Sequence, residues 1–371
     1  MTPELNWPQG NVSAEDFLQN YWQKRPLLIR DALPGFVSPV SGDELAGLAC
    51  EGEIESRIVI GQGKKWQLKQ GPFSEDEFAS LPPSHWTLLV QAVDHWVPEA
   101  RDLLNQFRFI PDWRLDDIMI SYATDGGGVG PHYDNYDVFL LQGTGQRRWQ
   151  TGQLCDGSTP LLNNQQLRLL NEFSSENDWV LNSGDMLYLP PRIAHLGEAI
   201  GDNCITISVG FRAPSYGEIT SEFSEFYSHL LPESKRYSDP NPQIQSSSAE
   251  IAPTAIANIQ EILRETAEQP ELIAQWLGQH MTLPKYQEHL EETAQESDRL
   301  LTAGSRLAWH QINEKEILFF VNGESRKLPS KAKQAVQLLC DTRALTDELG
   351  EALGDEIIFW LVDMQAFLPD E

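Results

Sequence analysis

Short apolar runs separated by Gly, Asn, Asp and Pro fill the chain from about residue 55 to residue 213. Runs of this kind, rich in β-branched and aromatic residues, predict short strands. We expect strands at Arg57–Ile60, Ile118–Ala123, Val138–Gln142, Arg147–Thr151, Trp179–Leu181, Met186–Leu189 and Ile205–Phe211. Many short strands at such intervals are typical of a double-stranded β-helix, also called a jelly-roll barrel.

Apolar residues at helical spacing occur on both sides of this region. An amphipathic helix is expected to begin near Ser13 and to end before Pro26, and Leu27–Ile29 follows as a buried strand. Beyond Pro214, the same spacing predicts helices at Ile219–Leu231, Ile251–Thr266 and Glu271–His280. A polar stretch rich in Asn, Pro and Ser between the first two is typical of a loop.

The C-terminal part combines a hairpin with helices. Ile317–Val321 is an apolar strand, and the Asn322-Gly323 pair after it is a strong two-residue turn signal. Other periodic or apolar segments lie around the hairpin, namely a helix through Tyr286 and Leu290, a helix over about Ala332–Leu339, and a final strand or helix at Ile357–Val362. A hairpin beside helices predicts a winged-helix-like domain.

These patterns together predict an α+β chain in three parts. The barrel spans residues 1–214, a helical region spans residues 215–282, and the winged-helix-like domain spans residues 283–371. Helices appended to a barrel often pair with a second copy, so we expect a homodimer. The alternative is that their apolar side chains only cover the barrel.

The charge of the chain limits its partners. Lys and Arg number 27 and Asp and Glu number 55, which gives a net charge of −28. Such a chain repels polyphosphate, so we expect no direct contact with nucleic acid, and the winged helix is expected to contact protein or to be structural. The same charge attracts basic partners, although solubility alone also explains it.

Cysteine usage and the N-terminus indicate the compartment. Cys50, Cys155, Cys204 and Cys340 show neither CxxC pairing nor short disulfide spacing, which indicates reduced thiols. The N-terminal segment lacks a basic region followed by an apolar run, and no later run is long enough for a membrane span. We therefore expect a cytoplasmic protein without membrane contact.

Three residues are candidate metal ligands. His132 and Asp134 are two positions apart, and on a strand such side chains share a face, roughly 6–7 Å apart, so both can reach one cation. His195 belongs to a later strand, and its spacing from Gly184 and Pro190 is that of a cupin's second motif. Two histidines and one carboxylate predict the facial triad that holds Fe(II) and leaves three coordination positions open.

An arginine on the metal's face would add a second binding group. A two-residue turn at Gly143-Thr144 pairs Leu140 with Arg147 and places Arg147 on that face, whereas a three-residue turn presents Arg148 instead. A guanidinium there can bind the distal carboxylate of 2-oxoglutarate through two hydrogen bonds. The alternative is that both arginines lie on the surface.

Two further residues are candidates beside the metal. Ser121, on the upstream strand, is expected to point inward as a second donor to the cosubstrate carboxylate. Asp125 precedes a run of glycines at the open side of the site, where it can accept hydrogen bonds from a cationic substrate side chain. The alternative for both is an ordinary sheet or turn residue.

Several segments of the chain resemble the bacterial ribosomal oxygenases of the JmjC group. The segments are Tyr21-Trp22-Gln23-Lys24-Arg25-Pro26-Leu27-Leu28, Asp112-Trp113-Arg114 with Asp116-Asp117, the run from Gly127 through Phe139, and Gly145-Gln146-Arg147-Arg148-Trp149. The resemblance runs over the whole length, and its specificity is concentrated between about residues 112 and 212.

This resemblance implies a JmjC barrel, a helical dimerisation region and a C-terminal winged-helix-like domain. It also implies Fe(II) bound by His132, Asp134 and His195, with 2-oxoglutarate held by Arg147. The implied reaction is hydroxylation at carbon 3 of an arginine in a large-subunit ribosomal protein, bacterial protein L sixteen. Ribosomal proteins are strongly basic, which agrees with the acidic charge of this chain. Since related ribosomal oxygenases hydroxylate histidine, the target residue rests on the resemblance alone.

Two other functions are compatible with the same residues. A metal-dependent cupin isomerase or dioxygenase that does not use 2-oxoglutarate would need the triad but not Arg147. An acidic adaptor with an inert barrel would bind basic ribosomal or chaperone clients through its helical and winged regions. The intact triad argues against the adaptor, because an inert barrel has no reason to keep an open metal site.

Overall fold

The computed structural model describes residues 12–63, 65–163, 166–239, 242–286 and 300–368. The chain divides into two compact units, Met1–Ala213 and Pro214–Glu371, and each is described by itself. The domain boundaries expected near residues 214 and 282 remain predictions.

Strands dominate the described part of the first unit. They are β1 (Leu27–Ile29), β2 (Ser56–Gln62), β3 (Lys65–Gln70), β4 (Trp86–Val90), β5 (Leu115–Ala123), β6 (Val138–Leu154), β7 (Ser175–Asn182), β8 (Met186–Leu189) and β9 (Ile193–Phe211). The helices are α1 (Ala14–Asn20), α2 (Gly42–Leu48), α3 (Glu75–Ala79), α4 (Val93–Trp96), α5 (Pro98–Asn105) and the 3₁₀ turn η1 (Asp112–Arg114).

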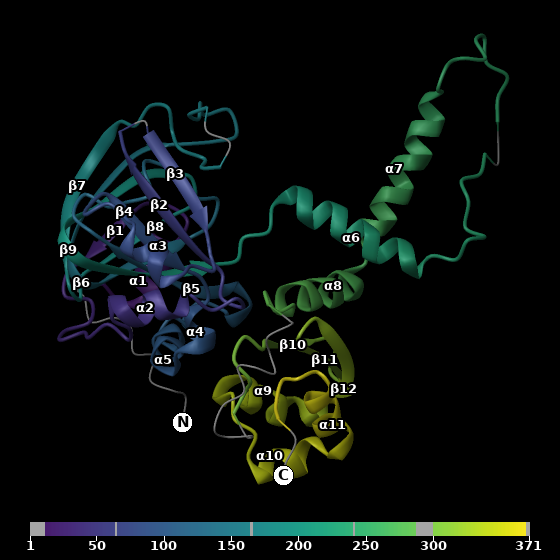
Figure 1. Ribbon diagram of the computed structural model, residues 1–371. Helices are drawn as coiled ribbons and strands as arrows, with labels where there is room; N and C mark the ends of the chain where they lie inside the picture. The colour runs from purple at the N-terminus through teal and green to yellow at the C-terminus, as the bar shows by residue number, and fades with distance from the viewer. Residues whose placement is uncertain (1–11, 64, 164–165, 240–241, 287–299, 369–371) are drawn as a thin grey trace. The chain divides into compact units, whose positions relative to one another are not determined.

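The two longest strands, β6 and β9, organise the barrel. The antiparallel sheet has the order β1-β8-β6-β9-β5-β4-β2-β3, and β7 also pairs with β6. Val138 of β6 pairs with Gly210 of β9, and farther along the same two strands Thr151 pairs with His195. Irregularities in the register between Gln142 and Gln146 lie between these two stretches. The strands therefore curve around an interior (Figure 1).

Both faces of β6 are buried over residues 138–143, and neighbouring residues there alternate between two cores. Phe139 and Leu141 belong to the large core that also contains residues of α1, α2 and α5. Val138 and Leu140 belong to a second cluster with residues of β7 and β8, on the opposite face of the sheet. This double burial explains why the strand begins with a continuous apolar run, Val138 to Leu141, rather than an alternating pattern.

The structure corrects the hairpin that we expected at Gly143-Thr144. β6 continues through these residues as one strand from Val138 to Leu154, and its partner β9 remains beside it. Gly145 adopts φ +68°, a left-handed conformation that permits the irregular register without a chain reversal. The strands predicted at 138–142 and 147–151 are therefore two halves of one element.

The second unit contains helices and a small sheet. Its elements are α6 (Tyr216–Leu230), α7 (Pro253–Ala267), α8 (Pro270–Thr282), β10 (Leu307–Gln311), β11 (Glu316–Val321), β12 (Glu324–Pro329), the 3₁₀ turn η3 (Ser330–Ala332), α9 (Lys333–Thr342), α10 (Asp347–Leu353) and α11 (Asp355–Asp363). The predicted hairpin is confirmed, since Val321 pairs with Glu324 and both Asn322 (φ 48°) and Gly323 (φ 90°) are left-handed.

Other expectations for this unit fared differently. Residues 357–362, left open as strand or helix, lie in the helix α11. The expected helix through Tyr286 and Leu290 is wrong at Tyr286, which follows the end of α8 outside any helix, and Leu290 lies outside the described residues.

Among the described residues of both units, no helix is both long enough and apolar enough to cross a membrane. All four cysteines are free thiols.

Candidate metal centre

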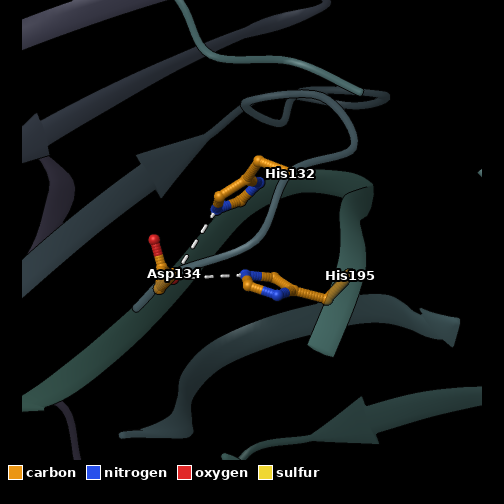
Figure 2. A group of neighbouring side chains, drawn as sticks. All are labelled: His132, Asp134 and His195. Carbon is orange, nitrogen blue, oxygen red and sulfur yellow. Dashed lines mark ion pairs between the residues drawn. The ribbon is translucent and has the colours of Figure 1, made fainter. Parts of the chain in front are cut away.

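The structure brings His132 and Asp134 together with His195, which comes from a distant part of the chain (Figure 2). Nε2 of His195 lies 3.6 Å from Oδ2 of Asp134, and Nε2 of His132 lies 3.9 Å from the same oxygen. One candidate ligand atom from each residue lies within 4.8 Å of the other two. A single cation can therefore contact two imidazoles and one carboxylate from one side.

Hydrogen bonds to main-chain carbonyls fix the tautomer of both histidines. Nδ1 of His132 lies 2.9 Å from the carbonyl oxygen of Gly130, and Nδ1 of His195 lies 3.0 Å from that of Ile193. A carbonyl oxygen only accepts, so each Nδ1 carries the proton and donates it. In the neutral imidazole, each Nε2 then has a free lone pair directed to the shared site, the arrangement that metal-binding histidines use.

The pKa of His195 also favours the neutral imidazole. Burial, together with the neighbouring His132, lowers the pKa of His195 to about 4, against the opposing attraction of Asp134. The His195 imidazole is therefore neutral at pH 7, as a metal ligand must be.

The segment that carries His132 and Asp134 is not the regular strand that we expected. His132 and His195 form an isolated antiparallel bridge with N–H···O=C distances of 3.0 and 2.8 Å, and β6 begins only at Val138. Beyond the bridge, the Arg192 N–H donates to the Asp134 carbonyl at 2.6 Å. Asp134 is thus held by a few specific hydrogen bonds instead of a continuous ladder.

Arg147 is buried next to this centre, and two of its side-chain nitrogens lack acceptors in the described part of the chain. It is 3% exposed, and its Nε and Nη2 have no hydrogen-bond partner among the described residues. Its pairing partner on β9 is Ala199, four residues from His195 on the same strand. Arg148, by contrast, is exposed and bonded to Asp178. Since buried polar groups are rarely left without partners, Arg147 has the donors for an anionic ligand.

Trp149 contributes a further donor that the sequence analysis missed. Its Nε1 is buried without a partner among the described residues, and its ring centroid lies 6.0 Å from that of His195 and 5.6 Å from Cζ of Arg147. The opposite edge of the indole lies against Gly197, where an added Cβ would come within 2.6 Å of the ring. The available signal was its position two residues after Arg147, which places both on one face of β6.

Comparison with known proteins identifies the family. The JmjC domain family matches residues 102–219, and the ROXA-like winged helix family matches residues 263–362. The ribosomal protein uL16 3-hydroxylase of Escherichia coli (strain K12) is 37% identical over 364 residues, covering 95% of this chain and 93% of that protein. The chain belongs to the JmjC ribosomal oxygenases.

Solved structures of a ribosomal oxygenase agree over nearly the whole length. The Escherichia coli ribosomal oxygenase YcfD in complex with cobalt and 2-oxoglutarate gives a TM-score of 0.81 at 34% identity, covering 97% of this chain and 99% of that chain. Its complex with cobalt and succinic acid gives 0.80 at 35% identity, with 97% and 99% covered. The predicted JmjC barrel and winged-helix-like domain of a ribosomal oxygenase are thereby confirmed.

The other two candidate residues of this ribosomal oxygenase lie in different settings. Ser121 is 5% exposed on β5, and its hydroxyl donates to the Thr206 carbonyl over a long 3.4 Å. Asp125 is exposed, and its Oδ1 accepts the Gly201 N–H at 2.7 Å. The roles of both residues at the site remain predictions.

Proposed function

We propose that this chain is an Fe(II)- and 2-oxoglutarate-dependent hydroxylase that acts on carbon 3 of an arginine in ribosomal protein uL16. The observation that carries the proposal is the joint presence of the facial cluster His132, Asp134 and His195 and the unpartnered buried donors of Arg147. The similarity to the uL16 3-hydroxylase of Escherichia coli supports the reaction and its protein substrate.

The donor set fits both cofactors. Two imidazole Nε2 atoms and a carboxylate suit Fe(II) and leave part of its coordination sphere to other ligands. The buried guanidinium of Arg147, with Ser121 as a second donor, suits the distal carboxylate of 2-oxoglutarate. A cupin enzyme that does not use 2-oxoglutarate would leave the charge of Arg147 buried without a counterion, which is costly.

The residues divide the work of the reaction. When bound, Fe(II) and 2-oxoglutarate supply the oxidising chemistry, in which dioxygen gives one oxygen atom to succinate and one to the hydroxylated product. His132, Asp134 and His195 keep their ligand atoms on one side of the site. Arg147 orients the cosubstrate from the barrel interior, where Val138, Leu140 and Leu187 exclude water.

The substrate side chain is proposed to enter at Asp125. This carboxylate is exposed in the turn that leads into the glycine run before His132. Asp202 lies next to it, because its Oδ1 accepts the Asp125 main-chain N–H at 3.2 Å. Two neighbouring carboxylates, in a chain of net charge −28, favour a basic ribosomal protein and disfavour direct contact with nucleic acid.

We further propose that the protein is a cytoplasmic homodimer with domains 1–214, 215–282 and 283–371. Neither α6 nor α7 has a buried residue, and α7 exposes Ile256, Ile259 and Leu263 along one face. Burying this stripe against a second copy would remove it from water. The proposed substrate supports the cytoplasmic location, since uL16 is a ribosomal protein.

Light scattering tests the dimer. The wild-type protein is expected at twice the chain mass of 41.9 kDa, and Ile259→Glu at that mass itself. Gln260→Glu adds the same charge at the next position along α7 and is expected to leave the dimer intact. A monomeric wild-type protein, or a dimeric Ile259→Glu variant, would contradict this interface.

Mass spectrometry tests the reaction. Purified ribosomal proteins incubated with the enzyme, Fe(II) and 2-oxoglutarate are expected to show a gain of one oxygen atom on uL16, with one succinate released per product. Asp134→Ala is expected to abolish turnover while the barrel stays folded, because Asp134 lies outside the strand ladder. Product formed without 2-oxoglutarate would favour the other cupin chemistry, and no product at all would favour the adaptor.

A further inference from the structure

Two segments of the sequence that stand apart from the metal ligands meet, together with Tyr188 of β8, at one buried carboxylate, Asp137. The Tyr188 hydroxyl donates to Asp137 Oδ1 at 2.6 Å, and Gln23 Nε2 donates to Oδ2 at 3.0 Å. Arg114 Nη2 lies 3.4 Å from the same Oδ2. Gln23 belongs to the Tyr21–Leu28 segment, Arg114 to the Asp112–Arg114 segment, and Asp137 to the run that contains the metal ligands His132 and Asp134. Asp137 itself is fully buried, at 0% exposure.

Each partner of Asp137 is in turn fixed by a second contact. The Gln23 main-chain N–H donates to the Tyr188 hydroxyl at 2.8 Å, which leaves the Tyr188 proton for Asp137. Gln23 adopts φ 57°, a left-handed conformation that is uncommon outside glycine and is held here by these bonds. Arg114 Nε donates to the Arg212 carbonyl at 2.7 Å. The carboxylate therefore lies in a preformed set of donors.

Asp137 also terminates the irregular segment that carries Asp134. Between the His132–His195 bridge and the start of β6, main-chain hydrogen bonds from Arg192 to the Asp134 carbonyl and from Phe211 to the Asp137 carbonyl hold the segment, at 2.6 and 3.2 Å. The side chain of Asp137 adds three contacts at the far end, three residues from the metal ligand. A shift at this end is passed along a short segment that has no continuous strand ladder to absorb it.

We propose that Asp137 is a positioning residue that, held by Tyr188, Gln23 and Arg114, fixes segment 132–137 and thereby the orientation of Asp134 toward the metal. This inference rests on the proposed metal-dependent function. It assigns a role to the two sequence segments that lie outside the metal cluster.

The chemistry of the cluster indicates which changes are informative. Asp137 accepts from every partner, so Asp137→Asn keeps the shape but places an amide N–H₂ against groups that also donate. Tyr188→Phe keeps the ring, which packs edge-on against Phe17 at a centroid distance of 4.7 Å, and removes one donor. Both variants leave the three metal ligands unchanged.

Asp185 provides a matched control in the same barrel. Its buried carboxylate accepts from the main-chain N–H groups of Asp31 and Asn182, both at 2.9 Å, and from the guanidinium of Arg30 at 2.6 Å. It belongs to the turn between β7 and β8 and to no segment that carries a metal ligand. Asp185→Asn therefore removes a comparable buried carboxylate without touching segment 132–137.

The experiment measures Co(II) binding to the full-length protein by titration and by the visible absorption of the bound ion, alongside thermal unfolding without metal. Asp137→Asn is expected to raise the Co(II) dissociation constant about 10- to 100-fold, the usual effect of losing a group that orients a ligand, and to alter the Co(II) spectrum. Tyr188→Phe is expected to act in the same direction by less. Asp185→Asn is expected to lower the unfolding temperature but to leave Co(II) affinity within about twofold of wild type.

The outcomes separate positioning from stability and from the proposed function. Wild-type Co(II) affinity and spectrum in both Asp137→Asn and Tyr188→Phe would overturn the positioning role, whatever their unfolding temperatures. If Asp137→Asn does not fold, Tyr188→Phe decides by the same criterion. A wild-type protein that binds Co(II) but hydroxylates nothing would refute the proposed function and leave the positioning result standing.

Discussion

Replacing Arg147 by methionine is expected to weaken 2-oxoglutarate binding and, in the same protein, to stabilise the ligand-free fold. Arg147 is 3% exposed, and its Nε and Nη2 have no acceptor among the described residues. Methionine has a similar length, fills the space with apolar atoms and carries no charge. The two effects have opposite signs because the buried guanidinium binds the anionic cosubstrate well but, without that anion, lowers the stability of the ligand-free fold.

The expected sizes of both effects follow from the burial of Arg147. A hydrogen bond to a charged partner contributes about 1.5–3 kcal/mol, so the loss of even one raises the 2-oxoglutarate dissociation constant roughly 10- to 150-fold. Replacing a buried charge by an apolar side chain of similar volume is often neutral or stabilising by about 1–4 kcal/mol. In a unit the size of Met1–Ala213, each kcal/mol corresponds to a rise in unfolding temperature of about 2–4 °C.

The assay pairs calorimetric titration of 2-oxoglutarate into Co(II)-loaded protein with thermal unfolding of the ligand-free protein. Arg148→Met is the matched control, because Arg148 is exposed and bonded to Asp178, and it is expected to change neither quantity appreciably. A wild-type 2-oxoglutarate affinity in Arg147→Met would refute the binding role. A marked fall in its ligand-free unfolding temperature would show that Arg147 has partners that compensate its charge.

Two other expectations concern stability. Burial alone would raise the pKa of Asp185, but the main-chain N–H groups of Asn182 and Asp31 and the Arg30 guanidinium together lower it. The ionised Asp185 carboxylate therefore stabilises the fold above the unfolded pKa, and this contribution is lost as the pH falls through the folded pKa. Asp185→Asn should therefore cost about 1–3 kcal/mol at pH 7 and progressively less in acid, as measured by urea unfolding at several pH values; an equal cost at every pH would contradict this. In the second unit, an added Cβ at Gly278 of α8 would lie 2.2 Å from the Phe320 ring, so Gly278→Ala should destabilise by about 1–3 kcal/mol despite the better helix propensity of alanine. Gly350 of α10 is half-buried, but an added Cβ there would meet no atom within 4 Å, so Gly350→Ala should not destabilise.

Features with local causes were predictable from the sequence. Met186–Leu189 is an apolar run bounded by turn residues, and β8 has those bounds. The left-handed turn at Asn322-Gly323 follows from the residue types that tolerate positive φ. The clustering of His132, Asp134 and His195 also followed, because the chemistry of one ion requires its ligands to converge.

Features that depend on hydrogen bonds to another segment were not predictable in this way. β3 consists of Lys65–Gln70, a polar segment with alternating exposure, and it is a strand because β2 pairs with it. The converse holds for Asp134, which was expected on a strand but lies in an irregular segment held from outside by Arg192. Intrinsic propensity describes neither case, since the deciding hydrogen bonds come from another segment, the preceding strand β2 for β3 and Arg192 for Asp134.

The burial of Arg147 was expected from a hairpin at Gly143-Thr144 that the structure does not contain. Counting alternate residues along an unbroken strand from the buried Gln142 would place Arg148 inside and Arg147 outside. The irregular register around Gly145 changes this parity by one residue, so Arg147 is buried and Arg148 is exposed. A two-residue turn at Gly143-Thr144 would have changed the parity in the same sense. The glycines indicate that the hydrogen-bond ladder is interrupted here. Whether the interruption is a turn or a bulge is decided by the continued pairing of β6 with β9, which is not a local property of the sequence.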